Sequence, residues 1–285
     1  MTIKLFTTTS LSTLCVLAVA FGFANAPAPV AAADPPVEPG SFVWHDLLTK
    51  DVAGARRFYG ELLGWRFEDT KRGDRPYVIA RSGATAVAGI VDVSGIADAG
   101  TQWLSFMAVA NVDAAVALFQ SGGGKVLVQP RDLPLARAAV VADPQGAPLG
   151  LAQLRRDVPN PAQPTASHFF WQEYLARDAG QALDFYKKVA GYTPAISDTR
   201  LGVEYHVLKK ARGGAGLFQL PANVTDVQPN WLPYVLVNDA ASLAARVTAL
   251  GGKVVVPAAP ERRNSSMIVV ADPAGAVLAL QKYPF

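Results

Sequence analysis

Apolar residues recur along this chain with two periods, and the segments they mark predict a regular series of strands and helices. A strand pattern over 42–48 is followed by Asp51, a good helix N-cap, and by apolar residues at helical spacing. These residues are Val52, Ala55, Phe58, Tyr59 and Leu62. Gly64 stands where a glycine is expected just after a helix. Three further strands are predicted at 65–68, 77–81 and 85–91, which gives the order βαβββ.

A second unit of the same order follows, and the whole pattern then recurs in the second half of the chain. The second unit has a strand at 103–109, a helix at 112–121 and strands at 125–129, 138–141 and 149–154. The two halves match at a nearly constant offset, as in Trp44 and Trp171, Asp51 and Asp178, Tyr77 and Tyr205, and Asp143 and Asp272. An offset this constant indicates a duplication, so we predict four βαβββ units in two domains.

Three prolines separate the repeats. Pro159, Pro161 and Pro164 lie within 155–165, where they stiffen the segment and block a helix or a central strand. We therefore predict a first domain over 39–154 and a second over 166–285, joined by this proline-rich linker.

The N-terminal segment, 1–33, has the pattern of a secretory signal peptide. Lys4 gives a thin positive region, 11–23 are apolar, and the small residues 31–33 offer a cleavage site. The apolar run is shorter than the roughly 20 residues that a membrane-spanning helix needs. We expect cleavage, a secreted or periplasmic mature protein and no membrane contact afterwards. An uncleaved membrane anchor is the alternative.

Composition, charge and cysteine content each narrow the possible classes of protein. The 285 residues are 51% hydrophobic and 17% charged, which is typical of a folded chain. The net charge of +3 includes no long lysine or arginine run, so we expect no nucleic-acid partner. The single cysteine, Cys15, lies in the predicted signal peptide, so the mature chain would enter an oxidising compartment without disulfides.

Motifs at both ends of each repeat carry a family resemblance. The first repeat opens with Trp44-x-Asp46-Leu47-x-x-x-Asp51, and both repeats close with Val-Val-Ala-Asp-Pro-x-Gly, at 140–146 and 269–275. In these motifs the chain resembles the vicinal oxygen chelate superfamily of glyoxalases, bleomycin-resistance proteins and dioxygenases. It most resembles the paired-domain subgroup that is labelled hydroxylase-like or 27 kDa antigen-like. The resemblance implies an α+β fold of two tandem domains. In each, two βαβββ modules form an open eight-stranded cup with helices outside.

The resemblance also locates where metal ligands would stand. Metalloenzymes of this family use four strand positions to supply His, Glu or Gln to a divalent metal, which holds two vicinal substrate oxygens. The matching positions here are Trp44, Leu104, Gly150 and one of 86–90, then Trp171, Leu232, Ala279 and one of 213–217. Because these offer no imidazole or carboxylate, we predict no metal and no cofactor.

The three histidines are expected to have structural or surface roles. His45 follows a ligand position by one residue, so strand alternation turns its side chain to the opposite face. His168 lies at the edge of the linker, and His206 neighbours Tyr205 on a middle strand.

Six matched residues are candidate ligand-binding residues: Trp44, Asp46 and Tyr77 in the first cup, and Trp171, Glu173 and Tyr205 in the second. The indoles either line a cavity for aromatic molecules or fill it as core. The carboxylates share the face of the indoles and could contact a ligand. The simpler interpretation is that they pair with an arginine such as Arg137 or are exposed at the rim. The tyrosine hydroxyls could orient a ligand, or belong to core packing.

Two functional hypotheses follow, and a third option, a structural or interaction protein in which both cups are plugged, stays open. The first, which we favour, is an exported, metal-free binding protein for a small apolar or aromatic molecule in one or both cups, without catalysis. The second is a metal-dependent lyase, isomerase or dioxygenase of the glyoxalase kind, supported by fold analogy. Since a paired-domain chain can complete its own pseudo-dimer, we expect a monomer.

Overall fold

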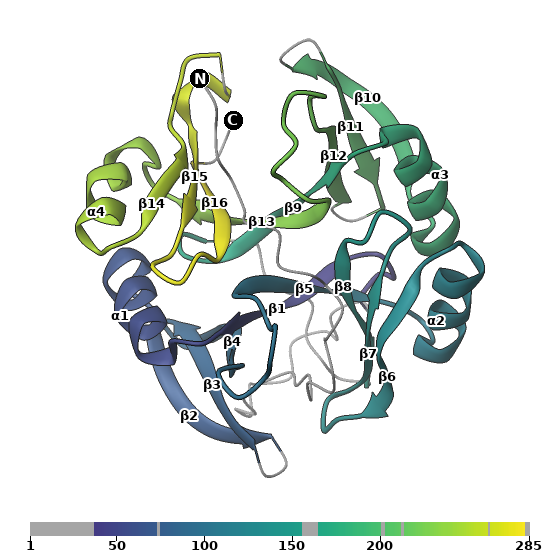
Figure 1. The fold of residues 1–285 in the computed structure, drawn as a ribbon, viewed down its shortest axis with the longest axis horizontal. Helices are drawn as coiled ribbons and strands as arrows, with labels where there is room; N and C mark the ends of the chain where they lie inside the picture. Colours follow the sequence, from purple (N-terminus) through teal and green to yellow (C-terminus); the bar gives the residue numbers. More distant parts are fainter. Residues whose placement is uncertain are drawn as a thin grey trace.

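The computed structural model describes residues 37–72, 75–155, 165–200, 203–211, 214–261 and 263–282. The predicted signal peptide and most of the predicted linker lie outside these residues. The described chain forms two eight-stranded mixed sheets, one from each repeat (Figure 1). Neither sheet closes on itself, because β2 and β6 are the two edges of the first and β10 and β14 are the edges of the second. The predicted fold class, two tandem cups of βαβββ modules, is confirmed.

The described residues of the first domain form two helices and eight strands. Its elements are β1 (Phe42–Thr49), α1 (Val52–Leu63), β2 (Arg66–Arg72), β3 (Arg75–Ser82), β4 (Thr85–Asp92), β5 (Gln102–Ala108), α2 (Val112–Ser121), β6 (Lys125–Asp132), β7 (Ala136–Ala142) and β8 (Pro148–Leu154).

The second domain repeats this order, with 3-10 turns added in its second module. Its elements are β9 (Phe169–Ala176), α3 (Ala179–Ala190), β10 (Thr193–Arg200), β11 (Val203–Lys209), β12 (Gly214–Gln219), β13 (Asn230–Val237), η2 (Ala241–Leu243), α4 (Ala244–Ala249), β14 (Lys253–Val256), η3 (Arg263–Ser265), β15 (Met267–Ala271) and β16 (Val277–Lys282).

Local chemistry fixes the ends of the two matched helices, α1 and α3. The Asp51 carboxylate accepts a hydrogen bond from the Gly54 amide at 2.8 Å, and Asp178 does the same for Gln181 at 2.9 Å. Each helix then ends at a residue with left-handed backbone, where glycine carries no steric cost. Residues at the two ends of each helix therefore determine where it begins and where it stops.

Several strands run past the limits that the apolar pattern predicts. β2 extends to Arg72 although the pattern supports only 65–68, and β6 extends to Asp132 rather than to 129. The added residues are mostly polar or charged. They are held by the antiparallel pairing of β2 with β3 and of β6 with β7 rather than by burial. Figure 1 shows the β2–β3 hairpin projecting from the sheet.

The two central strands of each sheet form the base of the cup. β1 pairs in parallel with β4 and antiparallel with β5, and β5 pairs in parallel with β8, so both modules contribute to one continuous sheet. The second domain repeats these pairings through β9, β12, β13 and β16. Because neighbouring strands are in register, side chains from four strands meet over the centre of each cup.

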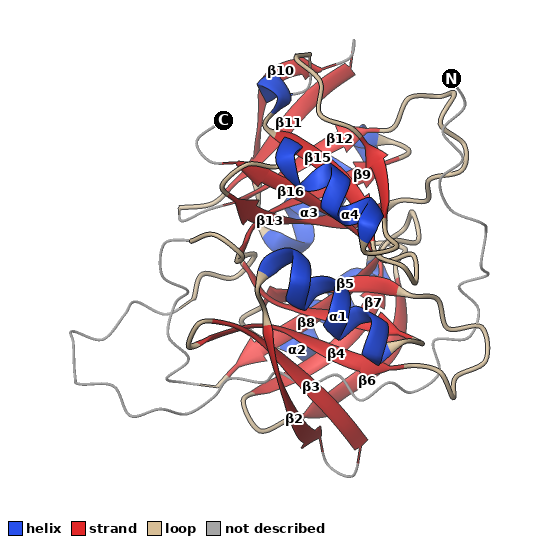
Figure 2. Cartoon of the chain, turned by 90° about the vertical axis from the view of Figure 1, so that its left-hand side faces the viewer, coloured by secondary structure: helices blue, strands red, loops and turns tan. Residues whose placement is uncertain are grey.

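The helices lie outside the cups and pack between the domains. Figure 1 shows α1 beside α4 and α2 beside α3, and Figure 2 shows α1 and α4 one above the other where the domains meet. The core beneath them is built from both domains: Phe58 and Tyr59 of α1 share a cluster with Ile268 and Leu278 of the second domain. A second cluster mixes the domains in the same way beneath α2 and α3.

Two equivalent hydrogen-bond chains join the domains across this core. The Trp103 indole donates to the Tyr59 hydroxyl at 3.1 Å, and Tyr59 donates to the Asp272 carboxylate at 3.2 Å. In the matching chain, Trp231 donates to Tyr186 at 2.9 Å and Tyr186 donates to Asp143 at 2.9 Å. Each carboxylate belongs to the Asp-Pro-x-Gly turn of the opposite domain, so both turns take part in domain pairing.

His45 lies at the boundary between the two halves. It is buried, faces away from the cup as strand alternation predicts, stacks on Phe169 and hydrogen bonds to Gln172. Gln172 is the residue that matches His45 in the second repeat, and its amide oxygen also accepts from Ser105 at 3.0 Å. His45 and Gln172, which occupy matching positions in the two repeats, thus contact each other where the domains meet.

Among the described residues, no helix is both long and apolar enough to cross a membrane. The expected membrane-free mature protein and its export stay predictions.

Candidate functional site

In the first cup, the three candidate residues form one hydrogen-bonded triad. The Trp44 indole N–H lies 2.9 Å from Asp46 Oδ1 and 3.1 Å from the Tyr77 hydroxyl. Tyr77 donates to the same Asp46 oxygen at 2.7 Å. Asp46 is 1% exposed and Trp44 is 2% exposed. The sequence pattern therefore selected three side chains that converge on one point.

The second cup keeps part of this triad and changes its carboxylate partner. The Trp171 indole donates to the Tyr205 hydroxyl at 3.2 Å, as in the first cup. Glu173, which matches Asp46, accepts a hydrogen bond from the guanidinium of Arg263 at 2.7 Å. Arg263 also donates to Tyr205 at 3.2 Å and to the Gln281 amide oxygen at 2.6 Å. A nearly buried ion pair thus stands where the first cup has Asp46.

Strand register explains why these side chains meet. Trp44 pairs with Phe106 of β5, which pairs with Gly150 of β8, while Asp46 of β1 pairs with Gly89 of β4. The second cup has the same rows, with Trp171, Tyr234 and Ala279 in one row and Glu173 beside Gly216 in the other. The duplication therefore preserves the geometry even where the side chains differ.

Two matched glycines make room for the tyrosine hydroxyls. A Cβ atom on Gly89 would lie 1.7 Å from the Tyr77 hydroxyl oxygen and 2.3 Å from Asp46 Oδ1. A Cβ atom on Gly216 would lie 2.0 Å from the Tyr205 hydroxyl oxygen. Both glycines fall within the segments expected to hold the fourth metal ligand. In this chain, those positions accommodate a phenol from the neighbouring strand.

Arg263 reaches the second cup from a turn of unusual backbone conformation. Arg263, Asn264 and Ser265 have φ values of 49°, 52° and 61°, so three successive non-glycine residues are left-handed. The guanidinium carbon lies 5.7 Å from the centre of the Tyr205 ring and 5.2 Å from that of Tyr234. Sequence reasoning missed this residue. The available signal was the Arg262-Arg263 pair, which has no counterpart in the first repeat.

Burial governs the ionisation of the phenols in the second cup. Burial, followed by the nearby charge of Glu173, raises the pKa of Tyr205 well above its ordinary value, although Arg263 opposes the shift. The same causes raise the pKa of Tyr234. Both phenols are therefore neutral near pH 7 and can serve as hydrogen-bond donors and as ring surfaces for a cation.

The residues at the family's ligand positions do not fit a divalent metal. Trp44 and Trp171 present N–H groups that only donate, Gly150 and Ala279 carry no donor atom, and Leu104 and Leu232 are apolar. In the second cup, a guanidinium already contacts Glu173, and its positive charge disfavours a metal ion there. No group of three His, Cys, Asp or Glu suited to a metal occurs in the described part of the chain.

One expectation about the carboxylates is wrong for Asp46. It is neither exposed at the rim nor paired with Arg137, because Arg137 bonds to Asp113 and Asp132 on the outer surface. The pattern located Asp46 on the cup face, but it could not show that Trp44 and Tyr77 would enclose it. For Glu173, an arginine partner does exist, but it is Arg263.

The other two histidines belong to the second repeat. The His168 imidazole lies 3.0 Å from the Thr165 hydroxyl, and His206 is a buried residue of β11. The structural or surface roles expected for them stay predictions.

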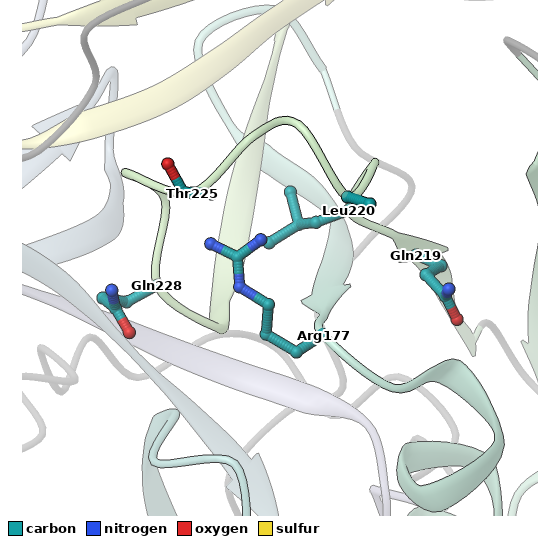
Figure 3. A pocket seen from close by; sticks show the side chains of 6 residues that line it. Arg177, Gln219, Leu220, Thr225 and Gln228 are labelled. Carbon is teal, nitrogen blue, oxygen red and sulfur yellow. The ribbon is translucent and has the colours of Figure 1, made fainter.

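A separate pocket of about 380 Å³ lies at the end of β9, outside the candidate residues. It is lined by Arg177, Gln219, Leu220, Ala222, Thr225 and Gln228 (Figure 3). The Arg177 guanidinium donates to the backbone carbonyls of Val224 and Val227, so its charge holds the surrounding loop in place.

The paired cups define a class of protein, and sequence comparison agrees with that class. A family model for the Glyoxalase/Bleomycin resistance protein/Dioxygenase superfamily matches residues 41–151 and again 166–280. The chain belongs to this superfamily, with one matching region in each half.

Known proteins similar to this chain include "Putative glyoxylase CFP32" of Mycobacterium bovis. It is 32% identical over 244 residues, which cover 84% of this chain and 93% of that protein. "Anthracycline biosynthesis protein DnrV" of Streptomyces peucetius is 33% identical over 121 residues, 42% of this chain and 44% of that protein. The crystal structure of the Mn(II)-bound glyoxalase from Novosphingobium aromaticivorans has a TM-score of 0.58 at 12% identity, covering 86% of this chain and 82% of that one. At this identity the similarity is one of fold.

Proposed function

We propose that this chain is an exported, metal-free member of the superfamily that binds a small apolar or aromatic molecule in one or both cups. The observation that carries the proposal is the repeated convergence of an indole, a phenol and a carboxylate at the cup centres. A few polar groups set among aromatic and aliphatic side chains are typical of small-molecule sites. The donor set is unsuited to a metal, which favours binding without metal-assisted chemistry.

The composition of the cup walls indicates the type of ligand. Apolar residues such as Leu48, Ile79 and Leu104 cluster with Trp44 and Tyr77 in the first cup. Planar aromatic molecules fit such walls because stacking on an indole adds to the burial of apolar area. One similar protein is named an anthracycline biosynthesis protein, and anthracyclines contain a planar aromatic ring system, which is consistent with this ligand class.

A thermal-shift screen with aromatic and apolar compounds tests the proposal, followed by calorimetric titration of each hit. Trp44→Phe and Trp171→Phe remove one indole N–H from each cup and should weaken binding in that cup. Trp65→Phe is the matched control, since it removes an indole N–H that donates to the Ser167 carbonyl outside the cups. If no compound in a broad library shifts the melting temperature, the proposed binding is contradicted.

A metal-dependent lyase, isomerase or dioxygenase is the competing function. Metal analysis of chain purified without chelators, together with turnover assays with added zinc, nickel, iron or manganese, separates the two. We expect no stoichiometric metal. Turnover that EDTA abolishes and that one of these metals restores would show a metal-dependent enzyme rather than a metal-free binding protein.

Export and a monomeric state belong to the same proposal. A mature N-terminus near Asp34 would be visible by mass spectrometry of the exported protein, and light scattering would give the mass of one chain. The paired domains support a monomer because their helices already cover each other's apolar faces. An intact chain from Met1 in the soluble fraction would contradict cleavage.

A further inference from the structure

The groups around Arg263 in the second cup are those that recognise a cation. Glu173 supplies a carboxylate at 2.7 Å and Gln281 a carbonyl oxygen at 2.6 Å. Tyr205 and Tyr234 supply ring faces whose centres lie 5.7 Å and 5.2 Å from the guanidinium carbon. We propose that the second cup is a binding site for an organic cation and that Arg263 occupies it as a built-in competitor. This inference rests on the proposed small-molecule binding and specifies the ligand class of one cup.

The chemistry of the site favours a positive ligand over a negative one. Carboxylate and amide oxygens attract positive charge, and the negative face of an aromatic ring does the same. These are the elements of the aromatic cages that bind quaternary ammonium groups. An anionic ligand would have to approach Glu173 and the ring faces, and both would repel it.

The backbone of the 263–265 turn indicates that this occupation carries a conformational cost. Left-handed residues other than glycine usually occur singly, and a run of three is unfavourable for L-amino acids. Strain of this kind concentrates at ligand clamps and switch regions. Withdrawal of the guanidinium would let the turn relax, which makes displacement by a ligand easier.

The first cup shows that the fold does not require this arginine. The corresponding loop of the first domain, between β6 and β7, contributes Leu133, which is buried in the apolar cluster of its cup. Buried ion pairs are often no more stabilising than apolar residues of similar size. An ion pair at this position in one repeat therefore points to a role in recognition rather than in folding.

The charge of Glu173 sets the charge of the ligand. A ligand with one positive charge would replace Arg263 without changing the net charge of the site. We therefore expect a protonated amine or a quaternary ammonium attached to an aromatic or apolar body that packs against Trp171.

Calorimetric titration of the full chain with three matched probes tests this assignment. Benzyltrimethylammonium is the cation, benzyl alcohol the neutral probe and benzenesulfonate the anion. Removal of the competitor in Arg263→Gln should tighten cation binding about tenfold or more, because a site that is mostly occupied has a reduced apparent affinity. In the same variant, benzyl alcohol should bind with nearly unchanged affinity, and benzenesulfonate should not bind more tightly than to the wild type.

Two further variants control this experiment. Arg137→Gln removes an arginine from the outer surface of the first domain and should leave all three affinities unchanged. Glu173→Gln in the Arg263→Gln background should remove the gain in cation affinity. If Arg263→Gln fails to fold, Arg263→Lys keeps a charge but loses the forked contacts, and it should show a smaller gain in the same direction.

Opposite results overturn the assignment. A folded Arg263 variant with unchanged or weaker cation affinity would show that Arg263 is not a competitor. Benzenesulfonate binding that Arg263→Gln abolishes would make Arg263 the anchor of an anionic ligand instead. Both outcomes leave aromatic binding by the wild-type chain intact, whereas failure of every compound to bind would overturn the proposed function itself.

Discussion

The two cups share an arrangement of strands and differ in the partner of one carboxylate. Asp46 accepts hydrogen bonds from the neutral donors Trp44 and Tyr77, whereas Glu173 accepts one from the charged Arg263. Glutamate is one methylene longer than aspartate, and the loop that supplies Arg263 has changed its sequence and conformation. Two local changes thus replace hydrogen bonds from neutral donors by an ion pair, while the arrangement of strands stays the same.

The largest expected difference between the cups is in the burial of their indoles. Trp44 is 2% exposed and Trp171 is half-buried. Trp44→Ala should lower the free energy of unfolding by about 3–5 kcal/mol, and Trp171→Ala by roughly half as much, because less apolar area is lost. Urea unfolding followed by circular dichroism measures both. Equal losses would mean that the two indoles are equally part of the core.

Removal of each carboxylate charge should affect the cups unequally. Glu173→Gln leaves the Arg263 guanidinium without its counter-ion and should cost about 3 kcal/mol. Asp46→Asn keeps an oxygen that accepts from Trp44 and Tyr77, and should cost about 1 kcal/mol. Replacing the pair together, Glu173→Leu with Arg263→Met, should recover most of the loss. Failure of the double variant to recover would mean that the ion pair itself stabilises the fold.

The comparison extends to the domain boundary, where His45 meets its counterpart Gln172. Burial lowers the pKa of His45 to about 3. Below pH 6.5, the unfolded chain binds a proton that the folded chain excludes, so stability falls as the pH drops from about 6.5 towards 3. The loss should reach roughly 2 kcal/mol at pH 5.

His45→Gln should remove this part of the pH dependence, because it places glutamine on both sides of the domain boundary. Urea unfolding of wild type and variant at pH 7.5 and pH 5 gives the comparison, and other titrating groups cancel between the two proteins. If the free energy of unfolding falls equally in wild type and variant between pH 7.5 and pH 5, the pH dependence does not come from His45.

The smallest expected effect concerns the two glycines that lie against the tyrosine hydroxyls, Gly89 in the first cup and Gly216 in the second. Gly89→Ala and Gly216→Ala place a methyl group against the hydroxyls of Tyr77 and Tyr205, and each should cost about 1–2 kcal/mol. Tyr77→Phe or Tyr205→Phe in the same chain removes the clashing oxygen and should recover part of that loss. Thermal melts of the single and double variants measure this, and additive losses would show that the glycines matter for another reason.

Features that depend on neighbouring residues could be predicted from the sequence. The caps Asp51 and Asp178 and the helix over 112–121 follow from residues within one turn of each other. The constant offset of the repeat then places Trp44, Asp46 and Tyr77 on one cup. The polar ends of β2 and β6 were not predicted, because backbone pairing holds them and the apolar pattern carries no sign of it.

Features that depend on distant residues were beyond sequence reasoning. Arg263 lies 90 residues from Glu173, and it reaches the cup through a run of three left-handed residues, which is rare without glycine. Tyr59 and Asp272 are 213 residues apart, although both belong to matched pairs of the repeat. The repeat matched Tyr59 with Tyr186 and Asp143 with Asp272, but it could not show that each tyrosine would bond to the aspartate of the opposite domain.

The shared cores have a consequence for the order in which the chain can fold during synthesis. The apolar face of α1, including Phe58 and Tyr59, packs against Ile268 and Leu278, which are synthesised only after the whole first domain. Nascent chains usually fold one domain at a time, beginning at the N-terminus. Here the first domain has to wait for β15 and β16, and a chain that ends before Met267 would leave the face of α1 in water. The newborn protein therefore depends on β15 and β16 to cover the apolar face of α1.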